Sequence, residues 1–600
     1  MRGRLSSIWS RKGPRNDSSQ PGGHGRLRYE VNDRIPRSIA LGLGLQLVAL
    51  AINGVVLLPT IVFRAGGAEE LIFWAVFASV LGAGVSAFLQ GTRIGGIGSG
   101  YALTHVSSAI FIAVCAEALL GGGPGLLATL VVISALVQIM LSARLSLLHR
   151  ILTPVVTGTV VMLLPVTVMP ILFDMLKEVP PGGPPHAAPL SAGITITVIL
   201  LIAVKGSGAL RLWAPAAGLV AGSLVGAYFG IYDTGRVGEA GWIGLPSGRP
   251  PGLDLTFDSA FWALLPAFLF VVLVGSTKSV AVAIAGQRVA WHRPRAVDYR
   301  AVQRAVAAEG AGNVLMGLAG TMPNTPHAGA VAAVEVTGIS ARSTAVTAGF
   351  IFLILTFLPK ALAIILAIPA AVVAATITVV MAMLFTVGMR EVVRSMGEDS
   401  RNGLIAGVAF WTGIAFEFDL IFPTTLTGFA GGLFQNSLTA GGLVVLLLTA
   451  LTARHKSRFQ GKLDMAELAP IQAFILAFAT RRDLMPIVER LEAASEEALL
   501  TLLQSRDQTD ANRNEGKRGL LLMASLKDSD VVLEFRVGAA GAEYLNLQDR
   551  LAWLPDQAEA ARAEHEVSLR LLRHYASSVR HQQFKDMDIL TLRFSSESRP

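Results

Sequence analysis

The sequence predicts an all-α polytopic membrane protein that carries a cytoplasmic α/β domain at its C-terminal end. Hydrophobic residues make up 52% of the 600 residues and charged residues only 15%, against about 25% charged residues in soluble domains. The apolar excess runs from about residue 39 to about residue 452, so a soluble enzyme with one small anchor is excluded. After about residue 455 the charges return, together with the periodicities of a soluble domain.

The N-terminal segment, residues 1–38, is polar and basic and lacks the apolar stretch of a signal peptide. We expect it to be a disordered cytoplasmic leader. The net charge of +8 suggests nucleic acid as a partner, but no basic stripe with interleaved aromatic residues supports that function. The single cysteine, Cys115, excludes an internal disulfide framework and a Cys-based zinc site.

The transmembrane domain, residues 39–453, contains about fourteen apolar runs, several of them shorter than the ~20 residues of a full crossing. They lie near 39–63, 71–90, 100–119, 124–143, 152–172, 191–205, 212–230, 260–285, 306–320, 328–339, 343–365, 367–388, 402–416 and 432–452.

The basic residues between these runs set the orientation, because cytoplasmic loops carry an excess of Lys and Arg. An even number of crossings puts both termini on one side, and the basic leader makes that side the cytoplasm. The loops that then face the cytoplasm carry Arg144, Arg150, Lys205, Arg211, Arg288, Arg293, Arg295, Arg300, Arg304, Arg342, Arg390, Arg394, Arg401, Arg454, Lys456 and Arg458. We therefore expect a multi-pass protein of the cell (inner) membrane with both termini in the cytoplasm.

Two of the runs are interrupted at matching places, the third of the first seven and the third of the second seven. Gly95–Tyr101 leads into Thr104–Ser108, and Thr321–Gly329 precedes the tenth run. Their correspondence predicts an inverted seven-plus-seven repeat, in which two half-helix N-termini meet near the middle of the membrane. The alternative is that Gly and Pro only kink packed helices.

A substrate site is expected where these half-helices begin, because hydroxyl groups, free backbone N–H groups and a cation gather there. Lys278 lies inside a span, where an unpaired cation costs at least ~2.5–3.5 kcal/mol, and helix N-termini also favour an anion. The alternative is that Lys278 pairs with Glu335. The candidate substrate-binding residues are Ser107, Ser108, Ser276, Thr277, Lys278, Thr325, His327, Ala328 and Gly329.

Three residues are candidates for coupling transport to a proton or sodium ion: His327, Glu335 and His105. A histidine can titrate near neutral pH, although an intramembrane histidine is more often a packing residue. The sequence has no Gly-rich phosphate loop ending in Lys-Ser/Thr and no metal-ligand spacing. We therefore expect no cofactor, no metal and no enzymatic activity.

Several motifs together resemble the nucleobase–ascorbate transporter family, the uracil and xanthine permeases. They are Tyr29–Pro36, Gly44–Gln46, Pro154–Met162, Pro323–Thr325, Thr337–Arg342, Leu358–Lys360 and Ala367–Pro369, within roughly residues 29–452. The resemblance implies a core domain of spans 1–4 and 8–11 beside a gate domain of spans 5–7 and 12–14. It also implies transport of nucleobases with a proton or sodium ion, often by a homodimer.

The sequence departs from this family where the family binds its substrate. The signature Gln-Asn-x-Gly is replaced by Gly329–Ala332, and Gly275 stands in place of the eighth-span carboxylate. The stacking aromatic residue of the third span corresponds to about Ser108.

Residues 454–600 are expected to form the cytoplasmic α/β domain. Gly519–Val537 predicts two strands, Glu564–His581 an amphipathic helix and Ile589–Phe594 a closing strand. This order is similar to histidine-kinase-like ATPase domains of the anti-sigma-factor type. However, Thr501 stands where those domains have Asn, and their Asp-x-Gly-x-Gly motif is absent. We therefore expect a regulatory or dimerising domain rather than a nucleotide site.

The sequence thus favours a secondary transporter of a nucleobase or a nucleobase-like solute, neutral or anionic, that works by an elevator movement. Two alternatives stay open. One is an inorganic or carboxylate anion carrier similar to the sulphate permeases, and the other is a transporter-derived sensor that signals through its tail.

Overall fold

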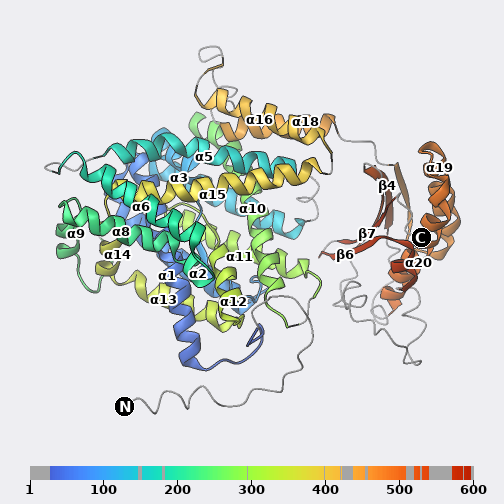
Figure 1. Ribbon diagram of the computed structural model, residues 1–600, viewed down its shortest axis with the longest axis horizontal. Helices are drawn as coiled ribbons and strands as arrows, with labels where there is room; N and C mark the ends of the chain where they lie inside the picture. Colours follow the sequence, from blue (N-terminus) through green and yellow to red (C-terminus); the bar gives the residue numbers. More distant parts are fainter. Residues whose placement is uncertain are drawn as a thin grey trace.

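The computed structural model describes residues 27–145, 152–178, 183–246, 248–292, 295–397, 399–418, 420–421, 437–452, 457–507, 519–527, 530–538, 570–584 and 587–595. They form a large helical domain and a smaller sheet domain beside one end of the helices (Figure 1). Residues 1–26 of the predicted leader lie outside the described residues. The prediction of disorder is wrong for the rest of the leader, because Tyr29 forms a β-bridge with Ile339, Val31 is buried and α1 begins at Arg37.

The helical domain follows the predicted apolar runs closely. Its first half contains α1 (Arg37–Ala65), η1 (Glu69–Leu71), α2 (Ile72–Thr92), β1 (His105–Ser107), η2 (Ala109–Phe111), α3 (Ile112–Ala143), α5 (Pro154–Lys177), α6 (Ala187–Lys205), α7 (Ala209–Leu212) and α8 (Ala214–Tyr228). Its second half contains α9 (Thr234–Glu239), α10 (Ser259–Arg288), α11 (Tyr299–Leu318), β2 (Asn324–Pro326), α12 (Ala328–Thr337), α13 (Ser343–Thr356), α14 (Pro359–Leu366), α15 (Ala370–Met396), α16 (Arg401–Glu417) and α18 (Ser437–Leu451).

Two breaks inside these helices have identifiable causes. Within α3, Gly123 has φ +77° just before Pro124, so the expected third and fourth runs meet at a kink there. The predicted run 343–365 is sharply bent, because α13 and α14 meet at an angle of 87°. Pro359 begins α14 and cannot continue the helix that precedes it.

The helices pack in two groups. In one, α11 and α10 pack along α3, while α13 packs along α2 and α1. In the other, α15 packs along α5 and α6, α8 along α6, and α16 along α18. The groups meet mainly through α10, which contacts both α5 and α18. We name them the α3 group and the α5 group.

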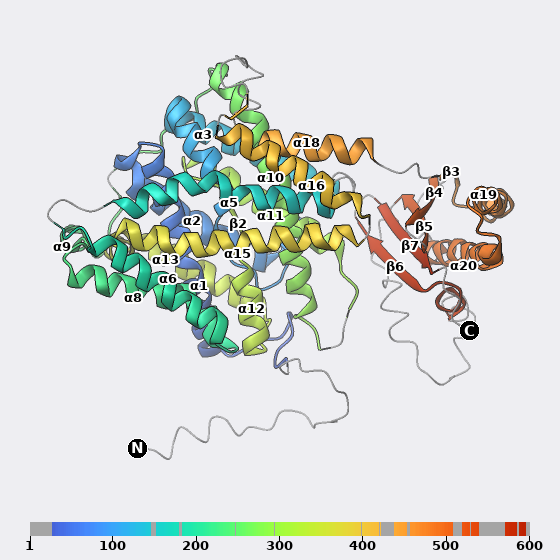
Figure 2. The ribbon, with the colours of Figure 1, turned by 45° about the horizontal axis from the view of Figure 1, so that its top comes forward.

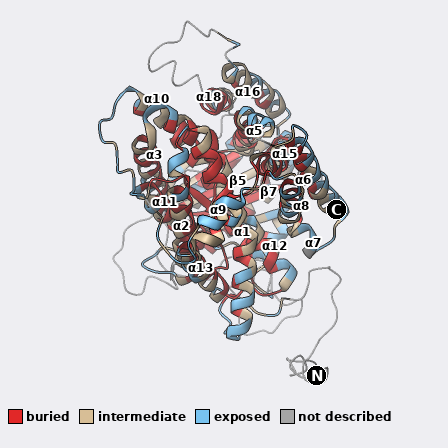
Figure 3. Cartoon of the chain, turned by 90° about the vertical axis from the view of Figure 1, so that its left-hand side faces the viewer, coloured by how far each residue is buried: buried red, intermediate tan, exposed pale blue. Residues whose placement is uncertain are grey.

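The surface of the helical domain is that of a membrane protein. Among the described residues, seven helices are long and apolar enough to cross a bilayer, and the bent pair α13–α14 makes an eighth if it counts as one crossing. Large apolar side chains lie exposed along the outer helices, such as Leu41, Met140, Leu201, Leu224, Leu404 and Leu447. Buried residues fill the interior and exposed ones lie on the outside (Figure 3), so this surface suits lipid.

The sheet domain contains β3 (Ser457–Lys462), η3 (Met465–Glu467), α19 (Leu468–Arg481), η4 (Met485–Ile487), α20 (Val488–Asp507), β4 (Gly519–Lys527), β5 (Asp530–Gly538), β6 (Ser578–Gln583) and β7 (Met587–Phe594). All strand pairs are antiparallel, in the order β3-β4-β5-β7-β6. The sheet lies between the helical domain and the helices α19 and α20 (Figure 2).

The sheet buries apolar residues from alternate positions. In β5, Val531, Leu533, Phe535 and Val537 are buried with α19 and α20 in one core. The predicted hairpin over Gly519–Val537 is confirmed by the pairing of β4 and β5.

The predicted helix Glu564–His581 is wrong at its C-terminal end. Ser578–Gln583 is strand β6, paired with β7. Four polar residues follow Val579 in a row, so the sequence here shows neither the helical nor the strand period, and the pairing with β7 decides the structure. Residues 564–569 lie outside the described residues.

Candidate functional site

The two interrupted segments meet in the middle of the α3 group. Strands β1 and β2 pair antiparallel, with His105 opposite Pro326, Val106 opposite Thr325 and Ser107 opposite Asn324. Each strand leads into a helix, since η2 and α3 follow β1, and α12 follows β2. The starts of these helices therefore lie close together, as the sequence predicted.

Backbone hydrogen bonds extend this crossing beyond the strands. The N–H of Ser108 donates to the carbonyl of Pro323 at 2.9 Å, and the N–H of His327 donates to the carbonyl of Thr104 at 2.8 Å. These bonds satisfy buried backbone groups that would otherwise be costly inside a membrane. They hold the two helix starts at a fixed separation.

A network of buried amides positions β2. The side chain of Asn313, on α11, accepts from the N–H of Asn324 at 2.8 Å and donates to its carbonyl at 3.1 Å. The side chain of Asn324 donates to Ser86 of α2 at 2.9 Å. Asn313 also donates to Gln138 of α3, at 3.2 Å. Three helices therefore fix one short strand.

Lys278 reaches this crossing from α10. Its Nζ lies 3.4 Å from the Oγ1 of Thr325, in the middle of β2. The ammonium group also interacts electrostatically with Glu309 of α11. The structure thus brings Lys278 beside β2, with Glu309 as a charged neighbour.

Glu309 is a functional candidate that the sequence analysis missed. It is only 1% exposed, and neither carboxylate oxygen accepts a hydrogen bond from any described residue at bonding geometry. Ser279 and Gln138 lie beside it, but the Ser279 hydroxyl donates to the carbonyl of Gly275. The sequence feature that could have identified Glu309 is a carboxylate within the apolar run 306–320. It lies one turn before Asn313 on the same helix face.

Several other polar groups at the crossing also have no hydrogen-bond partner among the described residues. They are the hydroxyls of Ser108 and Thr104, both ring nitrogens of His105 and Nδ1 of His327. Buried polar groups are normally hydrogen-bonded, so such a cluster calls for an explanation. A polar ligand at the crossing supplies one.

The predicted site residues do not all contribute in the same way. The Ser107 hydroxyl lies 2.7 Å from that of Ser79, and the Ser276 hydroxyl donates to the carbonyl of Val272. The Thr277 hydroxyl donates to the carbonyl of Val274 in its own helix. These three side chains are engaged within the fold.

The start of α12 is more open than the strands before it. Ala328 is exposed and Gly329 is half-buried. A Cβ added at Gly329 would lie 2.6 Å from the ring of His327, so that ring folds over the helix start. Glu335 lies farther along α12 on an exposed face. The structure therefore does not bring Glu335 together with Lys278.

Gly275, where the resembled family has a carboxylate, faces the start of α3. A Cβ at this position would lie 2.8 Å from the Cδ1 of Ile110. The space is therefore taken by an apolar side chain. The charge at this level of α10 comes from Lys278, one turn further along the helix.

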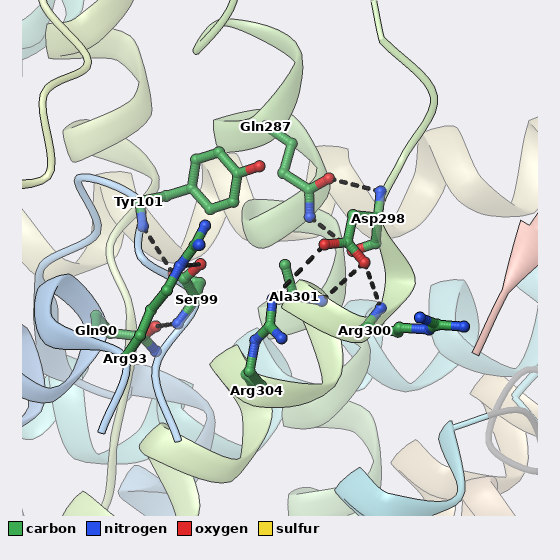
Figure 4. Close-up of polar contacts among 9 residues, drawn as sticks. All are labelled: Gln90, Arg93, Ser99, Tyr101, Gln287, Asp298, Arg300, Ala301 and Arg304. Carbon is green, nitrogen blue, oxygen red and sulfur yellow. Dashed lines mark hydrogen bonds and ion pairs between the residues drawn. The ribbon is translucent and has the colours of Figure 1, made fainter. Parts of the chain in front are cut away.

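A second polar network joins the α3 group where α10 ends and α11 begins (Figure 4). The side chain of Asp298 accepts from the N–H groups of Arg300 and Ala301, capping α11, and lies 3.6 Å from Arg304. The side chain of Gln287, near the end of α10, exchanges two hydrogen bonds with the backbone of Asp298.

The glycine-rich segment before β1 is fixed to the same network. The side chain of Gln90 accepts from the N–H of Ser99 and donates to the carbonyl of Ala305 in α11. Gly98 has φ +93° and approaches the carbonyl of Leu89 so closely that no side chain fits there. The glycine-rich segment before β1 is therefore a loop held in one conformation by specific hydrogen bonds.

No group of three or more His, Cys, Asp or Glu residues suited to a metal ion occurs in the part of the chain that the structure describes.

The family model and the related sequences agree on one family. A model of the Permease family, Xan_ur_permease, matches residues 38–420. The chain is 27% identical over 443 residues to a putative purine permease of Clostridium perfringens, covering 71% of this chain and 93% of that protein. It is 25% identical over 452 residues to the xanthine permease XanQ of Escherichia coli, covering 71% and 93%.

Among solved structures, the transmembrane domain of a cyanobacterium bicarbonate transporter, BicA, matches with a TM-score of 0.42 and 16% identity. The match covers 70% of this chain and 99% of that one.

Proposed function

Because the chain belongs to the xanthine and uracil permease family, we propose that it is a secondary-active transporter that carries an oxidised purine or a similar nucleobase-like solute across the inner membrane. The two named relatives are a purine permease and a xanthine permease, and this supports the substrate class. The family match covers the helical domain from residue 38 to residue 420, so it ends before α18 and before the sheet domain.

The proposal rests on buried polar side chains, at the crossing of β1 and β2, that have no hydrogen-bond partner among the described residues. Thr104, Ser108 and His327 bring side-chain groups without described hydrogen-bond partners to the crossing. The ring of His105 leaves the opposite face of the β1–β2 ribbon, because neighbouring residues of a strand alternate between its faces. A nucleobase edge presents several donors and acceptors in a plane, so it can pair with such groups. The backbone N–H groups at Ala328 and Gly329 add donors at a helix start.

The charge of Lys278 favours an anionic substrate. An ammonium group beside two helix starts attracts negative charge, and the low dielectric around it strengthens that attraction. Many oxidised purines lose a proton readily, whereas uracil is neutral near pH 7. We propose that the site prefers the anionic form.

We propose Glu309 as the principal coupling group, ahead of His105, His327 and Glu335. An ionised carboxylate without hydrogen bonds is costly to bury, so a bound proton or cation stabilises Glu309. When a proton neutralises Glu309, the charge of Lys278 is left to attract the substrate anion. Binding of the proton and of the anion then favour each other, as symport requires.

We propose that the α3 group is the core of an elevator and that the α5 group is its gate. The β1–β2 site lies wholly within the α3 group, so moving that group against the other would carry the substrate across. We further propose a homodimer with both termini in the cytoplasm and a regulatory role for the sheet domain.

The test is uptake of labelled urate, xanthine, uracil and sulphate into proteoliposomes. Saturable uptake of an oxidised purine supports the proposal, and sulphate uptake alone supports an anion carrier of another class. Ligand binding without any flux points to a sensor. Lys278→Met should reduce urate uptake far more than uracil uptake, and equal losses would contradict the preference for an anion.

A further inference from the structure

The sheet domain contacts Tyr299 of the helical domain through hydrogen bonds and ring packing. The hydroxyl of Tyr299 accepts hydrogen bonds from Gln582 at 2.7 Å and from Arg580 at 3.2 Å. The ring of Phe584 lies 4.7 Å from the Tyr299 ring, centroid to centroid. All three tail residues lie on or directly after β6, at alternate positions that share one face of the sheet.

The contact buries apolar surface as well as making hydrogen bonds. Tyr299 is 3% exposed and Phe584 is 1% exposed. Phe584 and Ile589 of β7 belong to the hydrophobic core of the helical domain, while the opposite face of the sheet packs on α19 and α20. The sheet therefore has two different cores, one on each face, and β6 is the edge strand next to the membrane helices (Figure 2).

Tyr299 lies at the junction of α10 and α11 in the α3 group. It is the first residue of α11 and directly follows Asp298, the cap that Gln287 ties to α10 (Figure 4). Glu309 lies ten residues further along α11, about 15 Å at 1.5 Å per residue, and Lys278 lies on α10. A displacement of Tyr299 would therefore move α11, which carries Glu309, and α10, which carries Lys278.

The same sheet domain is covalently attached to the other helix group. Its first strand, β3, begins at Ser457, and only four residues, 453–456, separate it from Thr452 at the end of α18. Five peptide links span at most about 18 Å. Because α18 belongs to the α5 group, the sheet domain is bonded to one group and docked on the other.

We propose that the sheet domain is a latch that holds the α3 group against the α5 group, and that release of β6 from Tyr299 permits transport. This rests on the proposed elevator, in which the two groups move past each other. A large movement must either part the Tyr299 contact or carry the sheet domain along on its short connection to α18. The docked tail therefore slows the cycle.

The experiment compares uptake by full-length variants in proteoliposomes with hydrogen–deuterium exchange at Ser578–Phe584. Tyr299→Phe removes the hydroxyl that accepts both hydrogen bonds but keeps the ring against Phe584. Arg580→Ala removes one donor from the tail side. Each change should raise the maximal uptake rate about threefold to tenfold, in line with the loss of one or two hydrogen bonds, and should speed exchange in β6.

Arg573→Ala is the matched control, because Arg573 is an exposed arginine of the same domain whose loss removes the same charge. It should leave uptake and exchange at β6 unchanged. The latch is overturned if wild-type protein transports and Tyr299→Phe speeds exchange without raising uptake, or if exchange at β6 does not change. If neither the wild type nor any variant shows flux, the transport proposal itself fails and the latch fails with it.

Discussion

At the level of single residues, the proposed anion preference and ion coupling depend on Lys278 and Glu309. The sequence singled out Lys278 because a cation inside an apolar run is costly. The alternative was a pair with Glu335, but Glu335 lies on an exposed face of α12, and Glu309 of α11 is the carboxylate that acts electrostatically on Lys278. Helix rotation decides which of two carboxylates faces inward, and neither spacing nor composition fixes the rotation of α11 against α10.

A double-mutant cycle tests this pair. Glu309→Gln removes one charge, Lys278→Met removes the other, and the double variant removes both. Each single variant leaves one buried charge uncompensated, so the free energy of unfolding should fall more in the singles than in the double variant. The coupling energy should be about 0.5–3 kcal/mol, measured by chemical unfolding in detergent. Additive losses would mean that the two charges do not interact.

His581 in β6 gives the sheet domain a predictable response to acid. The side chain is 4% exposed, and desolvation lowers its pKa to about 4 from the usual 6.5. The unfolded state therefore binds more protons than the folded state between these values, so the sheet domain loses stability as the pH falls from about 6.5 towards 4.

Exchange at β6 and β7 in the full chain, followed from pH 7 to pH 4.5, measures this response. His581→Gln should flatten the pH dependence, after correction for the intrinsic exchange rate. An equally steep dependence in that variant would show that His581 is not the responsible group.

At the scale of the element, the interrupted segments were the most successful sequence prediction. Gly and Pro spacing in Gly95–Tyr101 and Thr321–Gly329 located β1 and β2 to within a few residues. The pairing register and the amide network around Asn324 were beyond sequence reasoning, since they need the relative height of three helices. The turn at Pro359 was visible in the sequence as a proline, but its right angle was not.

The cap at the start of α11 gives a test at this scale. Asp298→Ala should cost about 1 kcal/mol for the lost cap and more because Arg304 loses its partner. Asp258→Ala is the matched control, because Asp258 caps α10 through the N–H of Phe261 at 2.9 Å. Thermal unfolding in detergent should show a larger loss for Asp298→Ala, and an equal loss in the two variants would contradict the role assigned to Arg304.

At the scale of the whole molecule, composition alone predicted a membrane domain followed by a soluble one, and the structure has a helical domain followed by a sheet domain. The number of crossings stays a prediction, because α8, α12 and α18 are too short to be assigned by length. The docking of β6 on Tyr299 had no signal in the sequence. Strand β6 begins 279 residues after Tyr299. The two segments meet only when both domains have folded.

The substrate is proposed to lie where β1 and β2 cross. Ser108→Cys in a Cys115→Ala background places a single thiol at that crossing, and its reaction rate with a small maleimide reports whether the site is occupied. We predict that urate or xanthine slows the reaction, with half-protection near the KM for uptake, while Ser207→Cys, at an exposed position between α6 and α7, shows no protection. Undiminished labelling of the Ser108→Cys thiol at saturating substrate, in protein that still transports, would contradict the account.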